Sequence, residues 1–262
     1  MKNELEMTLS SRRPFTESVA REQITALSEF AGGLMCPDKA SETEPIKAPF
    51  DPADLSGPVQ WLSKPLGQFL YRQGNPIQLG GEMWNRTLPA VSRFASPPFS
   101  NYWTGRFDGR WAIRVGIEMV LGFLSEMFRV TGSDFALLTT GTDRKAKNQG
   151  PMSHSYQGHD LAMGVPGLYW VNLFSDDLAE WLGLSTIPKE LGALTPLACG
   201  GWLLKFCEFP EQCRDADVLQ KQRAAIEWLG AEKFFDIRFP DRKLKAPDWK
   251  NMPVSALRNQ GH

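Results

Sequence analysis

The stretch Gly167-Leu168-Tyr169-Trp170-Val171-Asn172-Leu173-Phe174 carries no charge and is rich in aromatic and β-branched residues. Pro166 precedes it, and Ser175-Asp176-Asp177 follows it. A short apolar run between turn residues is typical of a buried β-strand, because a helix needs more length to present one apolar face. We therefore expect a buried strand over 167–174, around which the rest of the chain is organised.

A short helix is expected directly after this strand. Ser175 can cap its first turn, Asp176 and Asp177 suit the positive end of the helix dipole, and Gly183 can end it. None of these residues is typical of a nucleophile, a metal site or a phosphate-binding loop. Three apolar side chains share one face of the helix at helical spacing: Leu178, Trp181 and Leu182.

Hydrophobic periodicity predicts the remaining elements. Asp217 and Gln220 form a capping-box pattern at the start of the last helix. Polar, proline-rich or glycine-containing composition predicts an exposed loop over 36–58 and a connector over 142–160. Helices are expected over 16–31, 59–72, 119–129 and 217–229. Strands are expected over 77–84, 110–118, 134–140, 202–207 and 234–239.

This order of elements lacks the regular spacing of βαβ units, which indicates an α+β fold with mixed or antiparallel sheets and packed helices. We expect a single domain over 1–262. Two lobes, 12–141 and 161–245, would share its core, with 142–160 between them.

Composition limits the classes of function. The chain has 262 residues, 42% hydrophobic and 23% charged, with a net charge of −1, which does not favour direct nucleic-acid binding. Its four cysteines form no C-x-x-C pair, the first residues lack the apolar run of a signal peptide, and no apolar run is long enough for a membrane span. These features predict a cytoplasmic protein with reduced thiols and no membrane partner.

The chain contains no nucleophile-elbow, Walker or dinucleotide-binding motif. His154 and His159, with the adjacent Asp160, are the residues most typical of a metal site. A spacing of five does not place both histidines on one helical face, so ordinary surface histidines are the favoured interpretation. We expect neither metal nor cofactor, and a metal-dependent hydrolase built on these three residues is kept as an alternative.

Four segments, 49–54, 133–140, 166–174 and 194–204, resemble in order and spacing the immunity protein 52 family of bacterial polymorphic-toxin systems. The resemblance extends over roughly 12–250 and implies a non-enzymatic cytoplasmic protein. Such a protein binds and neutralises a cognate type VI secretion nuclease toxin of restriction-endonuclease-like fold. The family often opens with a strand and a tryptophan-glycine turn. This chain has only Arg12-Arg13-Pro14-Phe15 at that place, which does not favour an opening strand.

A nuclease must offer a positively charged cleft to its substrate, so an inhibitor that covers the cleft should present carboxylates. The 38–54 segment is the preferred group, because its acids have the least evident structural role. A chaperone or adaptor for the toxin is the remaining alternative function. The candidate toxin-binding residues are Glu42, Glu44, Asp51 and Asp54 in this segment, and Asp176, Asp177 and Glu180 near the central strand.

Overall fold

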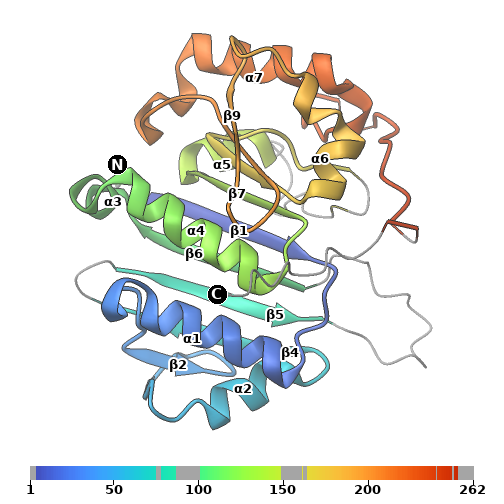
Figure 1. Cartoon of the computed structure of the whole chain (residues 1–262). Coiled ribbons are helices and arrows are strands. Elements are labelled where there is room, and N and C mark those ends of the chain that lie inside the picture. Colours follow the sequence, from blue (N-terminus) through green and yellow to red (C-terminus); the bar gives the residue numbers. More distant parts are fainter. Residues whose placement is uncertain are drawn as a thin grey trace. The chain divides into compact units, whose positions relative to one another are not determined.

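The structure, a computed structural model, has an α+β fold, as the sequence predicts (Figure 1). It describes residues 4–74, 78–86, 101–148, 161, 164–239, 241–249 and 251–252. The chain divides into two compact units, residues 1–133 (unit 1) and residues 134–262 (unit 2), and each is described by itself. Among the helices of the described residues, none has the length and apolar character that a bilayer-spanning segment needs.

Unit 1 contains an antiparallel sheet with the strand order β3-β2-β4-β5-β6-β1. The longest pairing joins the first and the last strand of the unit, from Glu4 opposite Asp108 to Ser11 opposite Asn101. The strands are β1 (Glu4–Ser11), β2 (Lys39–Ser41), β3 (Ala48–Pro49), β4 (Gly67–Arg72), β5 (Gly80–Asn85) and β6 (Asn101–Asp108).

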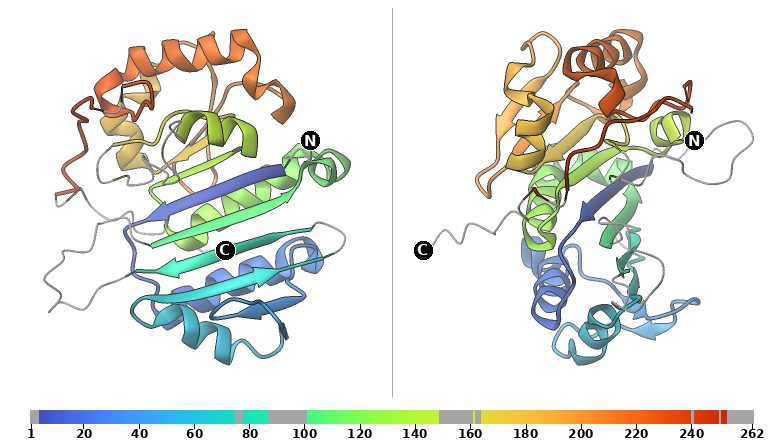
Figure 2. Two further views of the ribbon diagram at one scale, coloured as in Figure 1. Left: turned by 180° about the vertical axis from the view of Figure 1, so that it is seen from behind. Right: turned by 90° about the vertical axis from the view of Figure 1, so that its right-hand side faces the viewer.

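Two long helices of unit 1, α1 (Glu17–Gly33) and α4 (Ile117–Thr131), lie side by side on one face of this sheet (Figures 1 and 2). The shorter helices are α2 (Ser56–Ser63) and α3 (Gly109–Val115). Every second side chain of strand β1 points towards the layer between the sheet and the long helices, because successive residues of a strand point to opposite faces. Leu5, Met7 and Leu9 are at most 1% exposed there.

The strands of unit 2 pair antiparallel to one another in the order β7-β8-β10-β9. The predicted central strand is shorter than expected: regular pairing covers only β8, while residues 164–170 are irregular and buried. The strands are β7 (Phe135–Thr140), β8 (Val171–Phe174), β9 (Ala193–Pro196) and β10 (Trp202–Lys205). The helices are α5 (Gly141–Asn148), α6 (Asp176–Leu182) and α7 (Ala216–Leu229), with short 3₁₀ turns at Leu184–Thr186, Pro210–Arg214 and Ala231–Lys233.

The predicted strand over 110–118 is wrong, because this segment forms α3 and the start of α4. The Asp108 carboxylate accepts the N–H of Arg110 at 3.0 Å and caps α3. Gly116, at φ 92°, ends α3 and begins the turn into α4. A helix of seven residues makes fewer than two turns. An alternating apolar pattern over that length therefore does not distinguish it from a strand.

Other differences also have local causes. The helix expected over 59–72 stops at Ser63, because Pro65 cannot continue it, and β4 follows. The connector expected from residue 142 begins with α5, and residues 149–160 lie outside the described part of the chain.

The expectation against an opening strand is wrong, since β1 is eight residues long. The segment 234–239 forms no strand: Phe234 makes one isolated bridge, with Val165. The N-cap of α7 is Asp215, so Asp217 lies in the first turn instead of capping it. The division into lobes at 12–141 and 161–245 stays a prediction.

Candidate functional site

The predicted acids of the 38–54 segment lie around β2, β3 and the turn before α2 in unit 1. Glu44, Asp51 and Asp54 are exposed, and Glu42 is half-buried and forms an ion pair with Lys64. The segment is therefore not a structureless loop. Short strands and turns fix the backbone from which these carboxylates project.

Two of these carboxylates also support the turns that carry them. Asp51 Oδ1 accepts the N–H of Ala53 at 2.9 Å, and Asp54 Oδ1 accepts the N–H of Ser56 at 3.0 Å and its hydroxyl at 2.6 Å. The hydrogen bonds from the Ser56 side chain and backbone hold the pKa of Asp54 below its usual value, so it stays ionised at neutral pH. The acids thus have more local roles than the sequence indicates, while three of the four remain exposed.

The second predicted group lies on α6 in unit 2. Ser175 caps this helix by accepting the N–H of Leu178 at 3.4 Å, as expected. Asp176 is exposed, and its Oδ1 accepts the N–H of Gly201 at 3.2 Å. Glu180 is also exposed, and Asp177, the third predicted acid, is half-buried. The α6 acids belong to unit 2, whereas the 38–54 acids belong to unit 1.

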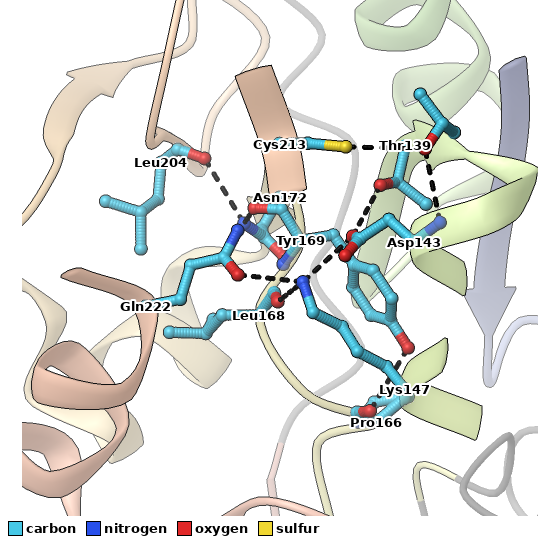
Figure 3. Close-up of polar contacts among 11 residues, drawn as sticks. Thr139, Asp143, Lys147, Pro166, Leu168, Tyr169, Asn172, Leu204, Cys213 and Gln222 are labelled. Atoms are coloured by element: carbon cyan, nitrogen blue, oxygen red, sulfur yellow. Dashed lines mark hydrogen bonds and ion pairs between the residues drawn. The ribbon is translucent and has the colours of Figure 1, made fainter. Parts of the chain in front are cut away.

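A polar cluster in unit 2 was not predicted from the sequence (Figure 3). Lys147 Nζ donates to Asp143 Oδ2 at 2.8 Å, to the carbonyl oxygen of Leu168 at 2.9 Å and to Gln222 Oε1 at 2.8 Å. It also lies 4.9 Å from the centre of the Tyr169 ring. The Asp143 side chain is fully buried, while 21% of the Lys147 side chain stays exposed. Burial lowers the pKa of Lys147, and the charge of Asp143 opposes this effect.

The cluster surrounds the buried irregular segment 164–170, whose backbone groups need partners other than a β-ladder. Asn172 supplies two of them: its Oδ1 accepts the Tyr169 N–H at 2.9 Å, and its Nδ2 donates to the Tyr169 carbonyl at 2.9 Å. The Trp170 indole N–H donates to the carbonyl of Cys207 at 2.9 Å. Together with the Lys147–Leu168 bond, these contacts make the cluster a support for the backbone of unit 2.

The cluster offers little chemistry beyond this support. Asp143 Oδ2 accepts the hydroxyl of Thr139 at 2.8 Å, while Asp143 Oδ1 and Gln222 Nε2 are buried with no hydrogen-bond partner among the described residues. The neighbouring Cys213 thiol lies 3.3 Å from the Thr140 hydroxyl, and burial raises its pKa, which disfavours a reactive thiolate. The spacing of four between Asp143 and Lys147 is the sequence signal that could have indicated α5.

The predicted histidine pair cannot be placed, since His154, His159 and Asp160 lie outside the described residues. Within the described ranges, no group of three or more His, Cys, Asp or Glu residues could hold a metal ion.

Two large aromatic side chains stand out on the surface of unit 2. Trp228, near the end of α7, is 58% exposed, and Phe239 is 52% exposed. Exposed tryptophan and phenylalanine are unusual enough on a soluble protein to mark a candidate contact surface. Sequence reasoning placed Trp228 only within a well-marked helix and did not separate it from the core.

Comparisons with known proteins show a likeness in fold to a solved structure. No family model matches the chain, and no curated protein matches its sequence. Among solved structures, the fold is similar to that of the Pseudomonas aeruginosa T6SS protein PA0821, with a TM-score of 0.53 and 12% sequence identity. The match covers 87% of this chain and 73% of that chain. At this level of identity, the two proteins share a fold.

Proposed function

We propose that this protein is an immunity protein that binds a cognate nuclease toxin of a type VI secretion system in the cytoplasm and blocks it by direct contact. Segments 49–54, 133–140, 166–174 and 194–204 support this proposal, because they resemble the immunity protein 52 family and, within it, the immunity protein TsiT, partner of the nuclease effector TseT. The fold shared with a protein named for the type VI secretion system is compatible with that setting.

The observation that carries the proposal is the group of four carboxylates in the 38–54 segment, of which Glu44, Asp51 and Asp54 are exposed. A nuclease cleft that holds phosphates is positively charged, so carboxylates held on short strands and turns complement it. Opposite charge accelerates association, because long-range attraction guides the two proteins together before they touch. The toxin would then be kept from its DNA by a protein that needs no chemistry of its own.

Neutralising the four acids tests this proposal. The variant Glu42→Gln, Glu44→Gln, Asp51→Asn, Asp54→Asn removes four charges, and asparagine keeps the side-chain acceptor that each turn uses. We expect the association rate constant with the purified toxin to fall by about tenfold at low salt and to lose most of its salt dependence. The melting temperature should change little. Association would be measured by surface plasmon resonance at two ionic strengths.

A matched control removes four exposed carboxylates elsewhere in unit 1. Their replacement by glutamine should leave the association rate and its salt slope closer to wild type. If both variants lower the association rate constant equally, the effect comes from net charge and not from this segment. If the first variant leaves the rate constant unchanged, the toxin binds another surface. The control residues are Glu4, Glu17, Glu29 and Glu118.

Two genetic measurements separate the proposal from its alternatives. Co-expression with the toxin should rescue bacterial growth, and continued killing in the presence of folded protein would refute neutralisation. A chaperone or adaptor would instead be required for secretion of the toxin by the producing cell. Replacing His154 and His159 by alanine should leave protection intact, whereas loss of protection in a folded variant would favour metal chemistry.

A further inference from the structure

The turn between α2 and β4 in unit 1 carries a strained leucine on its surface (Figure 1). The turn spans 64–67 and is closed by the Gly67 N–H, which donates to the Lys64 carbonyl at 2.9 Å. Leu66, its third residue, has a φ of 58°, in the left-handed region. An L-residue there brings its Cβ close to the following carbonyl oxygen, so glycine or asparagine usually occupies this place in a turn. Leucine at 66 therefore costs folding stability that glycine would not.

The packing of unit 1 does not account for this leucine, because Leu66 is 54% exposed. The turn does contain a glycine, but at the next position. A Cβ on Gly67 would collide with the carbonyl oxygen of Trp61, so the close approach of the backbone requires glycine there. Strained backbone positions of this kind gather at functional sites. A large apolar side chain that is both strained and exposed indicates a contact made outside the chain.

Two contacts connect this turn to the acidic 38–54 segment. Lys64, the first residue of the turn, forms an ion pair with Glu42. Gln68, which follows the turn in β4, donates from Nε2 to the carbonyl oxygen of Glu42. The side chain of Glu42 nevertheless stays 35% exposed. The backbone that carries one of the candidate toxin-binding carboxylates is therefore held against the turn that carries Leu66.

The chemistry of Leu66 and Glu42 indicates what covers them. Lysine and arginine lay their aliphatic stems along apolar surface and direct their charged heads to polar partners. Leu66 offers the apolar part of such a contact, and Glu42 offers the anionic part. Lys64 already places its ammonium group on Glu42, so the site accommodates a cation. An ion pair between side chains that are 48% and 35% exposed contributes little to stability, so an incoming cation can replace Lys64 at small cost.

We infer that Leu66 is a specificity-determining contact residue for the nuclease toxin, and that Leu66 and Glu42 together receive one lysine or arginine side chain of its phosphate-binding cleft. This inference rests on the proposed function. It deepens that function by separating two roles: the acids of the 38–54 segment attract the cleft, and Leu66 prolongs the complex once it has formed. The rigid turn suits this role, because a side chain that is already held in place loses less conformational entropy when a partner covers it.

Binding kinetics test the inference, with a catalytically inactive form of the toxin identified by co-expression as the probe. Leu66→Asn suits the left-handed backbone and removes the apolar side chain. It should raise the dissociation rate constant by about tenfold, because the exposed leucine surface is no longer buried in the complex. Its association rate constant should stay near wild type, and its melting temperature should be unchanged or higher. Leu66→Met keeps an apolar side chain and should dissociate within about twofold of wild type.

Two further variants sharpen the test. Gln78→Asn is the matched control, since Gln78 is an exposed residue of unit 1 with a φ of 56°, between β4 and β5. It relieves the same kind of backbone strain and should leave both rate constants near wild type. The double variant Leu66→Asn, Glu42→Gln should dissociate more slowly than the product of the two single effects predicts, because one toxin side chain contacts both residues.

The outcomes separate the inference from the proposed function. If wild-type protein binds the toxin and Leu66→Asn dissociates no faster, the inference fails while the proposed function stands. If wild-type protein does not bind the toxin, both fail. Single effects that simply multiply would refute the shared contact. A fall of more than about 5 °C in the melting temperature of Leu66→Asn would assign the leucine to the packing of unit 1 and overturn the inference. Sedimentation that shows self-association lost in Leu66→Asn would assign it to a second copy of the chain, with the same consequence.

Discussion

Replacing Lys147 by methionine should destabilise unit 2 strongly, although the side chain lies in a segment whose composition resembles a polar connector. Methionine keeps most of the stem length and removes the ammonium group, which donates to Asp143, Leu168 and Gln222 at 2.8–2.9 Å. The fully buried Asp143 carboxylate would then keep only the Thr139 hydroxyl, at 2.8 Å, among its described hydrogen bonds. Most of the loss in folding stability would come from the Asp143 charge, which would stay buried without a positive partner.

The magnitude follows from the geometry of the pair. Removing one partner of a buried ion pair costs about 3–5 kcal/mol. The lower end applies here, because 21% of the Lys147 side chain is exposed and water can reach part of the site. We therefore expect a loss of about 3 kcal/mol, which corresponds to a fall of about 6–12 °C in melting temperature for a chain of this size.

A double-mutant cycle distinguishes this mechanism from simple loss of packing. Asp143→Asn combined with Lys147→Met removes both charges, so the double variant should be more stable than the sum of the single effects predicts, by at least about 1.5 kcal/mol. Stability would be measured by urea unfolding followed through tryptophan fluorescence. Lys145→Met, an exposed lysine of the same helix, is the control and should change little. Additive single effects, or a loss below about 1 kcal/mol for Lys147→Met, would refute the reasoning.

Three further changes have defined outcomes. Trp170→Ala should cost about 3–5 kcal/mol in urea unfolding, because the side chain is 0% exposed. Trp170→Phe loses the bond to the Cys207 carbonyl and part of the ring volume but keeps a buried aromatic ring, so it should cost less. Equal costs for the two variants would contradict this. Burial raises the pKa of the Cys207 thiol to about 12, so the folded state holds this proton more tightly than the unfolded state and stability should fall as pH rises from about 9 towards 12. Cys207→Ala should flatten that decline, and an unchanged slope would argue against it. Gly81→Ala should cost about 3 kcal/mol by thermal unfolding, since its Cβ would collide with the Thr104 carbonyl oxygen; Gly122→Ala, with its nearest neighbour 3.8 Å away, is the control and should be neutral or stabilising.

Local signals account for the parts of the fold that the sequence predicts well. Helix α6 was predicted from Ser175 and Gly183, and both cap it as expected. Strand β7 and helix α4 follow equally directly from their apolar patterns. The failures occur where a pattern is short or where distant partners decide the structure. Segment 110–118 is too short for its period to be informative, and β1 is a strand because β6 lies opposite it.

In the candidate sites as well, local sequence indicates some features, and others depend on residues far apart in the chain. The acids of the 38–54 segment could be named from composition, but their turn contacts could not, because these depend on backbone geometry at Ser56 and Ala53. The Asp143–Lys147 cluster could not be predicted, because its third member, Gln222, lies on α7, 75 residues further along the chain than Lys147. The exposure of Trp228 likewise follows from which face of α7 the rest of unit 2 covers.

The pairing of β1 with β6 has a consequence for synthesis on the ribosome. The partner of β1 follows it in the chain by roughly a hundred residues. Synthesis proceeds at about 5–20 residues per second, so β6 is made on the order of 5–20 s after β1. During this time Leu5, Met7 and Leu9 lack the neighbouring strand with which β1 pairs. Unit 1 therefore cannot close progressively behind the emerging chain. Each newly begun chain therefore remains open for this interval before the sheet of unit 1 can be completed.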